Sequence, residues 1–417
     1  MASLQLAAIL VTLSAIFAWL NHRFIRMPAT IGLMLIALLF SLSIVGLSAL
    51  GFSEFEKRVT SIIAGVDFDT ALLHGMLSFL LFAGALHVNL AELNKQKWVV
   101  AVLATLGVII STFVVGALAW GALGLIGVSV PLIYCLIFGA LISPTDPIAV
   151  LGILKKVGAP KSLEIKIAGE SLFNDGVGVA MFIVLLQIAR HGDMDGAAIA
   201  TLFATEAIGG ILFGLFIGGI ATWTLRRSND YQVEVLITLS LVMGGYALAT
   251  ALHVSGPVAV VVAGLMVGYH GRAEAGSHTE HKHLDTFWEL MDEILNAILF
   301  VLIGLELLVL SFHGEHLLAA LLAIPIVLLA RFISVGFPII LMHTTRTFAR
   351  GTVSMLTWGG LRGGVSVALA LSLPNTPYRE LILTMTYVVV VFSILVQGLT
   401  IGPVMRRVVG NEQQISQ

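Results

Sequence analysis

The chain of 417 residues is 58% hydrophobic and only 11% charged, and its formal net charge is −2. Soluble globular proteins carry about 25% charged residues, so this composition excludes a soluble protein with a single membrane anchor. The near-neutral charge and the lack of a long basic run argue against nucleic-acid binding. The single cysteine, Cys135, excludes an intrachain disulfide.

Thirteen apolar runs follow one another along the chain, and we predict that each is a transmembrane helix. About 20 apolar residues are needed to cross about 30 Å of hydrocarbon as a helix, and the runs lack the alternation of β-barrel strands. The ninth run is the shortest and begins at Ser255-Gly256-Pro257. The predicted spans cover about 4–20, 28–50, 70–89, 98–120, 131–152, 167–189, 198–225, 233–252, 256–269, 288–310, 317–342, 352–372 and 381–402.

An odd number of spans places the two termini on opposite sides of the membrane. Sixteen lysines and arginines fall in predicted loops on one side and four on the other, while Arg331 and Arg362 lie inside spans. Because cytoplasmic loops are enriched in basic residues, we predict a multi-pass protein of the plasma (inner) membrane, with the N-terminus outside and the C-terminus in the cytoplasm. Residues 1–404 then form the transmembrane domain and 405–417 a short cytoplasmic tail.

The fifth predicted span is interrupted by Ser143-Pro144-Thr145-Asp146-Pro147. Each proline removes a backbone donor and clashes with the preceding turn, so the helix is expected to unwind near the middle of the membrane. Backbone groups freed at that depth survive only inside protein or beside a wet cavity. A proline kink used for packing is the alternative, but the aspartate between the prolines argues against it.

The twelfth predicted span contains Gly359-Gly360-Leu361-Arg362-Gly363-Gly364, whose glycines weaken the helix and let other backbones approach. An arginine inside the bilayer costs at least about 2.5–3.5 kcal/mol and needs a partner. Spans five and twelve are predicted to run in opposite directions, which makes about 4–189 and 233–402 two inverted six-helix repeats with crossed, interrupted helices. Such repeats are typical of secondary transporters.

The sixth predicted span carries a dense polar motif, Gly169-Glu170-Ser171-Leu172-Phe173-Asn174-Asp175-Gly176. On a helix, Ser171, Asn174 and Asp175 share one face, and Glu170 stacks below Asn174. Ionisable residues inside a membrane mark ion or proton paths. These oxygens, with carbonyls freed in the fifth span, suit a hard monovalent cation. No His/Cys cluster lies nearby, which argues against a transition-metal site.

Asp175 is the predicted carrier of both the cation and the proton. Burial disfavours the charged carboxylate, so a proton and a cation can compete for it. A site of this kind that is exposed alternately to each side exchanges one for the other. Asn174 has no exchangeable charge and is expected to orient its neighbours, and a structural role for Glu170, as the partner of Arg362, is favoured.

The motifs at 143–147, 169–176 and 359–364 resemble those of the monovalent cation:proton antiporters of the sodium/proton exchanger type, in the same order and over nearly the whole chain. The resemblance implies an electroneutral exchange of one sodium or lithium ion for one proton by a homodimer. It implies no cofactor and no enzyme activity. The presence of Asn174 before Asp175 favours the electroneutral branch of the family.

The resemblance also implies roles for single residues. Asp175 would carry the ion and the proton, Thr145 would supply a backbone carbonyl and Ser171 a hydroxyl, while Asp146 would lie near the crossing of the interrupted helices. The predicted ion-binding set is therefore Thr145, Asp146, Ser171, Asn174 and Asp175.

Glu170 and Arg362 resemble the structural ion pair of the same family. Span three departs from the family, because it offers His74, His87 and Asn89 where an acidic ligand is common. The segment before Ser255 also lacks the acid expected there. A potassium/proton antiporter on the same scaffold therefore stays open as the alternative.

Two further clusters have ordinary explanations beside functional ones. Acidic residues at the start of span ten either draw cations toward a funnel or form an ordinary helix start; they are Asp285, Glu289, Asp292 and Glu293. The histidines at 270, 278, 281 and 283 are interpreted as part of a solvated loop in preference to a metal site or pH sensor. A cation channel is disfavoured because no filter motif repeats, and an enzyme because Ser171 has no histidine partner on its helix.

Overall fold

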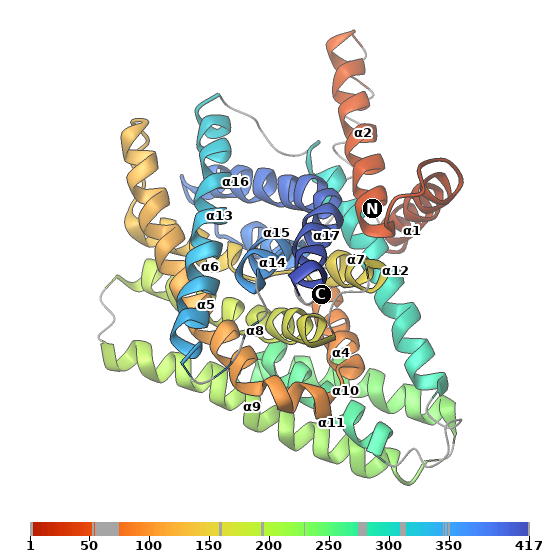
Figure 1. Ribbon diagram of the computed structural model, residues 1–417. Coiled ribbons are helices and arrows are strands. Elements are labelled where there is room, and N and C mark those ends of the chain that lie inside the picture. The colour runs from red at the N-terminus through yellow and green to blue at the C-terminus, as the bar shows by residue number, and fades with distance from the viewer. Residues whose placement is uncertain are drawn as a thin grey trace.

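The computed structural model describes residues 3–51, 54, 75–157, 161–192, 196–228, 230–273, 282–308, 314–344, 346, 348 and 351–415. Within these ranges the chain is helical (Figure 1), and the only β contact is an isolated antiparallel bridge between Asp146 and Leu361. The predicted all-α membrane fold is confirmed.

The helices follow the apolar runs of the sequence. In chain order they are α1 (Ser3–Leu20), α2 (Ala29–Ala49), α4 (Leu77–His87), α5 (Leu90–Leu125), α6 (Leu132–Ile142), α7 (Ile148–Val157), α8 (Lys161–His191), α9 (Gly196–Leu225), α10 (Tyr231–Ala251), α11 (Gly256–Ala273), α12 (Lys282–Glu306), α13 (Gly314–Met342), α14 (Thr352–Gly359), α15 (Gly364–Leu371), α16 (Arg379–Phe392) and α17 (Gly398–Ile415). Short π-helical turns, Asn21–Ile25 and Ser393–Gln397, extend α1 and join α16 to α17.

By length and composition, eight helices of the described chain can cross a bilayer, and three shorter apolar helices accompany them. Each predicted span overlaps a helix, although span three begins outside the described residues. Spans five and twelve are each divided between two short helices, α6 with α7 and α14 with α15. The count of thirteen spans and the inverted repeats stay predictions.

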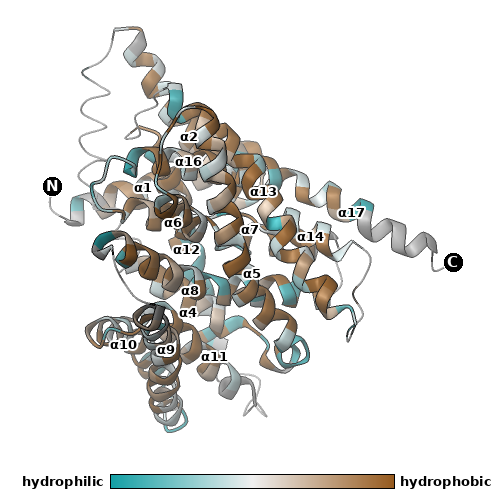
Figure 2. Ribbon diagram, turned by 90° about the vertical axis from the view of Figure 1, so that its left-hand side faces the viewer, coloured by the Kyte–Doolittle hydropathy of each residue, from teal (hydrophilic) through white to brown (hydrophobic). Residues whose placement is uncertain are grey.

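The outer surface of the described chain is apolar, as a bilayer requires. Hydrophobic residues run along most helices (Figure 2). Large side chains such as Phe216 and Trp223 of α9, Leu236 of α10, and Phe337 and Ile340 of α13 are more than half exposed. Because lipid tails are as apolar as these side chains, the helices need no polar outer face.

Helices α9, α10 and α11 pack on one another and lie together in the lower part of Figures 1 and 2. Their close approach depends on small residues: a Cβ on Gly214 of α9 would lie 2.5 Å from the carbonyl oxygen of Ala259 in α11. Such contacts stabilise helix pairs in lipid by van der Waals packing. Helix α11 also contacts α4 and α8, which connects this group to the rest of the bundle.

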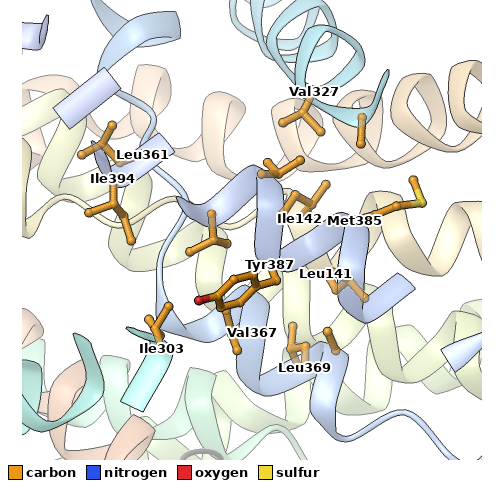
Figure 3. Close-up of a cluster of buried hydrophobic side chains, with 14 of the residues drawn as sticks. Leu141, Ile142, Ile303, Val327, Leu361, Val367, Leu369, Met385, Tyr387 and Ile394 are labelled. Carbon is orange, nitrogen blue, oxygen red and sulfur yellow. The ribbon is translucent and has the colours of Figure 1, made fainter. Parts of the chain in front are cut away.

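The main hydrophobic core lies among the helices that carry the interruptions. In Figure 3, Leu141 of α6, Val367 of α15 and Tyr387 of α16 lie together, and all three are buried. Helix α15 contacts α6, α12 and α16. The other short helices beside the interruptions are packed as well: α6 contacts α5 and α8, α7 contacts α8 and α17, and α14 contacts α13 and α17.

Candidate functional site

The first interruption separates α6 from α7 and follows from its two prolines. In a continuous helix the carbonyl of Ser143 would accept from residue 147, which is a proline without an N–H. The amide of Ile148, which would serve the Pro144 carbonyl, instead donates to Oδ1 of Asp146 at 2.9 Å. Asp146 therefore caps the start of α7, and Pro147 lies directly before the first helical residue, where its missing N–H leaves no helical hydrogen bond unmade.

The second interruption separates α14 from α15 and touches the first. The backbone N–H of Asp146 donates to the carbonyl of Leu361 at 2.8 Å. Gly363 lies so close that a Cβ on it would be 2.6 Å from both Cβ and Oδ2 of Asp146. The two unwound segments therefore cross in direct backbone contact, which only a glycine at 363 permits.

Arg362 donates to the two carbonyls that the first interruption leaves without a helical donor. Its Nη1 donates to the carbonyl oxygens of Ser143 at 2.6 Å and Pro144 at 3.1 Å, and the residue is only 2% exposed. Its backbone N–H donates to Oγ of Ser393, whose own hydroxyl donates to Oε1 of Gln397. A charged donor to a buried carbonyl is worth about 1.5–3 kcal/mol, so Arg362 stabilises the unwound segment between α6 and α7.

The prediction that Glu170 pairs with Arg362 is wrong. Glu170, 1% exposed, forms a two-pronged ion pair with Arg331 of α13, at 2.5 Å from Nη1 to Oε1 and 3.0 Å from Nη2 to Oε2. The same Nη2 also donates to the carbonyl of Leu356 at 3.2 Å. The guanidinium of Arg362 is engaged instead by the orphaned carbonyls of the first interruption, which leaves Arg331 as the partner of the acid.

Asn174 of α8 holds the unwound segment from the other side. Its Oδ1 accepts from the backbone N–H of Thr145 at 3.3 Å, and its Nδ2 donates to Oγ1 of Thr145 at 2.7 Å. The hydroxyl of Ser171 lies 2.9 Å from that same Oγ1. Both ends of the Asn174 amide therefore form hydrogen bonds to Thr145, and these bonds hold Thr145 beside α8.

Asp175 differs from its neighbours because its carboxylate is not fully engaged. Its Oδ1 is buried and has no hydrogen-bond partner among the residues that the structure describes. A buried oxygen left unpaired costs about 1–3 kcal/mol, and more when it is charged. Such a group in a native protein calls for a partner, and for a carboxylate oxygen that partner is a proton, a water molecule or a bound cation.

A cavity of about 540 Å³ reaches Asp175. Its lining comes from α4, the first interruption, α7, α8, α12 and the start of α15. One end carries exposed residues, among them Asn89, Lys161 and Glu289, and the other carries buried ones, among them Thr145 and Ser171. The cavity therefore leads from a polar mouth to a floor formed by the interruption and by the motif of α8.

The structure brings together most of the residues singled out from the sequence. Thr145, Asp146, Ser171 and Asp175 line the cavity, and Asn174 lies behind them on Thr145. Among the described residues of span three, His87 and Asn89 line it as well. His74 and the histidines at 278 and 281 lie outside the described residues, and those that are described include no group of three or more His, Cys, Asp or Glu placed to hold a metal ion.

Sequence reasoning gave no role to three groups that the structure brings to the site. Arg331 was visible as a basic residue inside a span, and the need to neutralise a buried charge is the signal that pointed to it. Asn296 and Ser366 line the cavity from α12 and α15. Neither has a local sequence signal, because an isolated amide or hydroxyl in an apolar helix is common.

Comparison with known proteins places the chain in a family. The family described as "Sodium/hydrogen exchanger, transmembrane" matches residues 10–407. A Pseudomonas aeruginosa protein named Na(+)/H(+) antiporter NhaP is 53% identical over 97% of both chains. A Halobacillus aidingensis protein named Na(+)/H(+) antiporter NhaH is 34% identical over 97% of this chain and 96% of its own.

The fold also has a solved counterpart. The sodium proton antiporter MjNhaP1 from Methanocaldococcus jannaschii superposes with a TM-score of 0.77, covering 98% of this chain and 100% of that one. Its sequence identity is 20%, so this similarity concerns the fold alone.

Proposed function

Because this chain belongs to the sodium/hydrogen exchanger family, we propose that it is a secondary transporter that exchanges sodium or lithium ions for protons across the membrane. The relatives named above, which match it over nearly their full lengths, are sodium/proton antiporters by name. The observation that carries the proposal is the unpartnered carboxylate oxygen of Asp175 at the end of a polar cavity.

Asp175 is the group that binds either the cation or the proton in this proposal. Oxygens of Ser171 and Thr145, fixed by Asn174, stand on the same cavity wall and suit a hard monovalent ion. Oδ1 of Asp146 accepts from the backbone N–H of Ile148 and so caps α7. The carboxylate of Asp146 therefore contributes negative charge beside the ion while this oxygen keeps its hydrogen bond. Competition of the two ions for Asp175 then couples their transport.

The exchange is proposed to be electroneutral, with one cation for each proton. Asn174 carries no exchangeable charge, and Glu170 is neutralised by Arg331 on the side of α8 away from the cavity. Asp175 is therefore the one acid of the motif free to titrate. Loading it with sodium or with a proton leaves the same net charge in the site.

The membrane placement is part of the proposal. The cavity mouth carries Lys161, which belongs to the predicted cytoplasmic side, and we propose on that ground that the cavity opens to the cytoplasm. Alternating access requires a second form in which Asp175 faces the other side. We place residues 1–404 in the plasma (inner) membrane with the N-terminus outside, the tail 405–417 in the cytoplasm, and the protein in a homodimer.

Liposomes that contain a trapped pH dye and carry an imposed proton gradient test this function. The wild-type protein should dissipate the gradient only after sodium or lithium is added, and the rate should not change when the membrane potential is clamped. Asp175→Asn should abolish the response. The control is Asp230→Asn, an exposed N-cap of α10 at which asparagine caps equally well; it should transport like the wild type.

Three outcomes would oppose the proposal. Exchange retained by Asp175→Asn would remove this residue as the carrier. A response to potassium alone would favour the potassium/proton antiporter on the same scaffold. Proton flux that follows the clamped potential and needs no opposing cation would indicate a channel.

A further inference from the structure

Helix α12 presents a polar stripe to the cavity that the proposed exchange at Asp175 does not use. Glu289, Asp292 and Asn296 are spaced by three and four residues, which places them on one face of the helix. All three line the cavity, and exposure falls along the stripe from Glu289 to the buried Asn296. The stripe therefore leads from the mouth toward the floor.

Asn296 is the first observation that points to a ligand. The residue is 3% exposed, and its Nδ2 donates to the backbone carbonyl of Asp292 at 2.8 Å. Its Oδ1 is buried and has no hydrogen-bond partner in the described part of the chain. The helix holds the donor end of the amide, and the acceptor end is left without a partner in a residue that lines the cavity.

Asp292 is the second observation. Its side chain is half-buried on the cavity wall one turn nearer the mouth than Asn296. Asp146 and Asp175 line the same cavity. The acid of α12 and the acid of α8 therefore face one cavity, and a cation that enters it meets negative charge on both walls.

We propose that Asp292 and Asn296 form a second, weaker site for the transported monovalent cation, on the route between the cavity mouth and Asp175. The donor set is a carboxylate and an amide oxygen, which suits a hard cation. A single charge and an open mouth suit a monovalent ion that binds briefly. This inference rests on the proposed antiport, because it assigns the same ion to a second position.

A staging site of this kind raises the local concentration of the cation beside Asp175. Its loss should therefore raise the apparent KM for sodium added on the side of the cavity mouth while the maximal rate is retained. We expect Asp292→Asn to raise that KM about fivefold, equivalent to about 1 kcal/mol. Asp230→Asn, at the exposed N-cap of α10 and outside the cavity lining, is the control and should leave the KM unchanged.

A relocated carboxylate separates a binding role from a structural one. The double variant Asp292→Asn with Asn296→Asp keeps one acid and one amide on the same stripe and should restore most of the sodium KM. A merely structural role for Asp292 would not be restored by moving the charge one turn along the helix. An unchanged KM in Asp292→Asn, in liposomes where the wild type exchanges sodium for protons, would overturn the inference and leave the antiport standing.

Binding of thallium(I) to the purified full-length protein tests the site without transport. Equilibrium dialysis of Asp175→Asn should show weak residual thallium binding, and addition of Asp292→Asn should remove it. Equal binding by the two variants would overturn the second site. If the wild type shows no cation-coupled exchange at all, the antiport proposal fails while this comparison still reports whether α12 holds a monovalent cation.

Discussion

The two helix interruptions touch each other, yet their backbones are satisfied in different ways. The proline interruption depends on side chains from elsewhere, since Arg362 serves its carbonyls and Asn174 holds Thr145. The glycine interruption depends on close approach, through the bridge from Asp146 to Leu361 and the missing Cβ of Gly363. The first presents oxygens to a cavity, and the second supplies the arginine that stabilises it.

The two buried arginines show the same contrast. Arg331 neutralises a carboxylate on the face of α8 away from the cavity, whereas Arg362 neutralises backbone dipoles at the crossing. Removal of each should therefore have a different consequence. Loss of Arg331 leaves an uncompensated charge, while loss of Arg362 leaves unpaired carbonyls beside the ion site.

Arg331→Met should have the largest effect on stability. It leaves Glu170 buried and charged without its partner, and breaking a buried ion pair costs about 3–5 kcal/mol. Thermal unfolding in detergent measures the loss. Glu170→Gln should recover much of it in the Arg331→Met background and should not recover Arg362→Met. If Glu170→Gln rescued the Arg362→Met variant instead, the result would support the pairing of Glu170 with Arg362 that the sequence alone suggested.

Arg362→Met should have the next largest effect on stability and should also impair transport. It removes two charged donors from the carbonyls of Ser143 and Pro144, and one such bond contributes about 1.5–3 kcal/mol. Because those carbonyls adjoin Thr145, the sodium-coupled rate in liposomes should fall even in protein that remains folded. If the folded variant transported at the wild-type rate, the hydrogen bonds of Arg362 at the crossing would not be required for ion exchange.

Gly363→Ala should have the smallest effect on stability, but it acts directly on the contact between the interruptions. Its Cβ would lie 2.6 Å from Asp146, and overpacking of this kind costs about 1–3 kcal/mol. The backbone at 363 is extended, with φ −129°, so the expected effect is a steric clash and not backbone strain. Sodium-coupled exchange and unfolding temperature should both fall.

Gly359→Ala is the matched control for that change. A Cβ there would make ordinary contacts, the nearest at 3.5 Å to Cγ1 of Val150. The variant should keep the unfolding temperature and transport rate of the wild type. If both alanine variants behave alike, the close approach of Gly363 to Asp146 is not required for exchange.

Much of the site could be predicted because its signals are local. Two prolines three residues apart interrupt a helix wherever they occur, and the spacing of Ser171, Asn174 and Asp175 places them together on any helix. The apolar runs likewise predicted helices that the structure contains. These features depend on covalent geometry and helical periodicity, which do not change with the rest of the fold.

The partners of the charges could not be predicted in the same way. Two arginines lie inside predicted spans, 161 and 192 residues from Glu170, and local rules do not state which of them approaches the acid. The sequence favoured Arg362 by resemblance, and the structure contains Arg331. The unused acceptor of Asn296 was equally invisible, because its meaning depends on a cavity formed by distant helices.

The sequence by itself determined where helices form, where two of them break and which helix carries the acids, because hydrophobic length, proline chemistry and a 3.6-residue period act within one segment. Only the tertiary structure decided that the breaks touch, that Arg362 donates to the carbonyls of Ser143 and Pro144, and that a cavity ends at Asp175. These contacts join segments far apart in the chain, and they depend on packing that leaves a buried charge or carbonyl with one partner within reach.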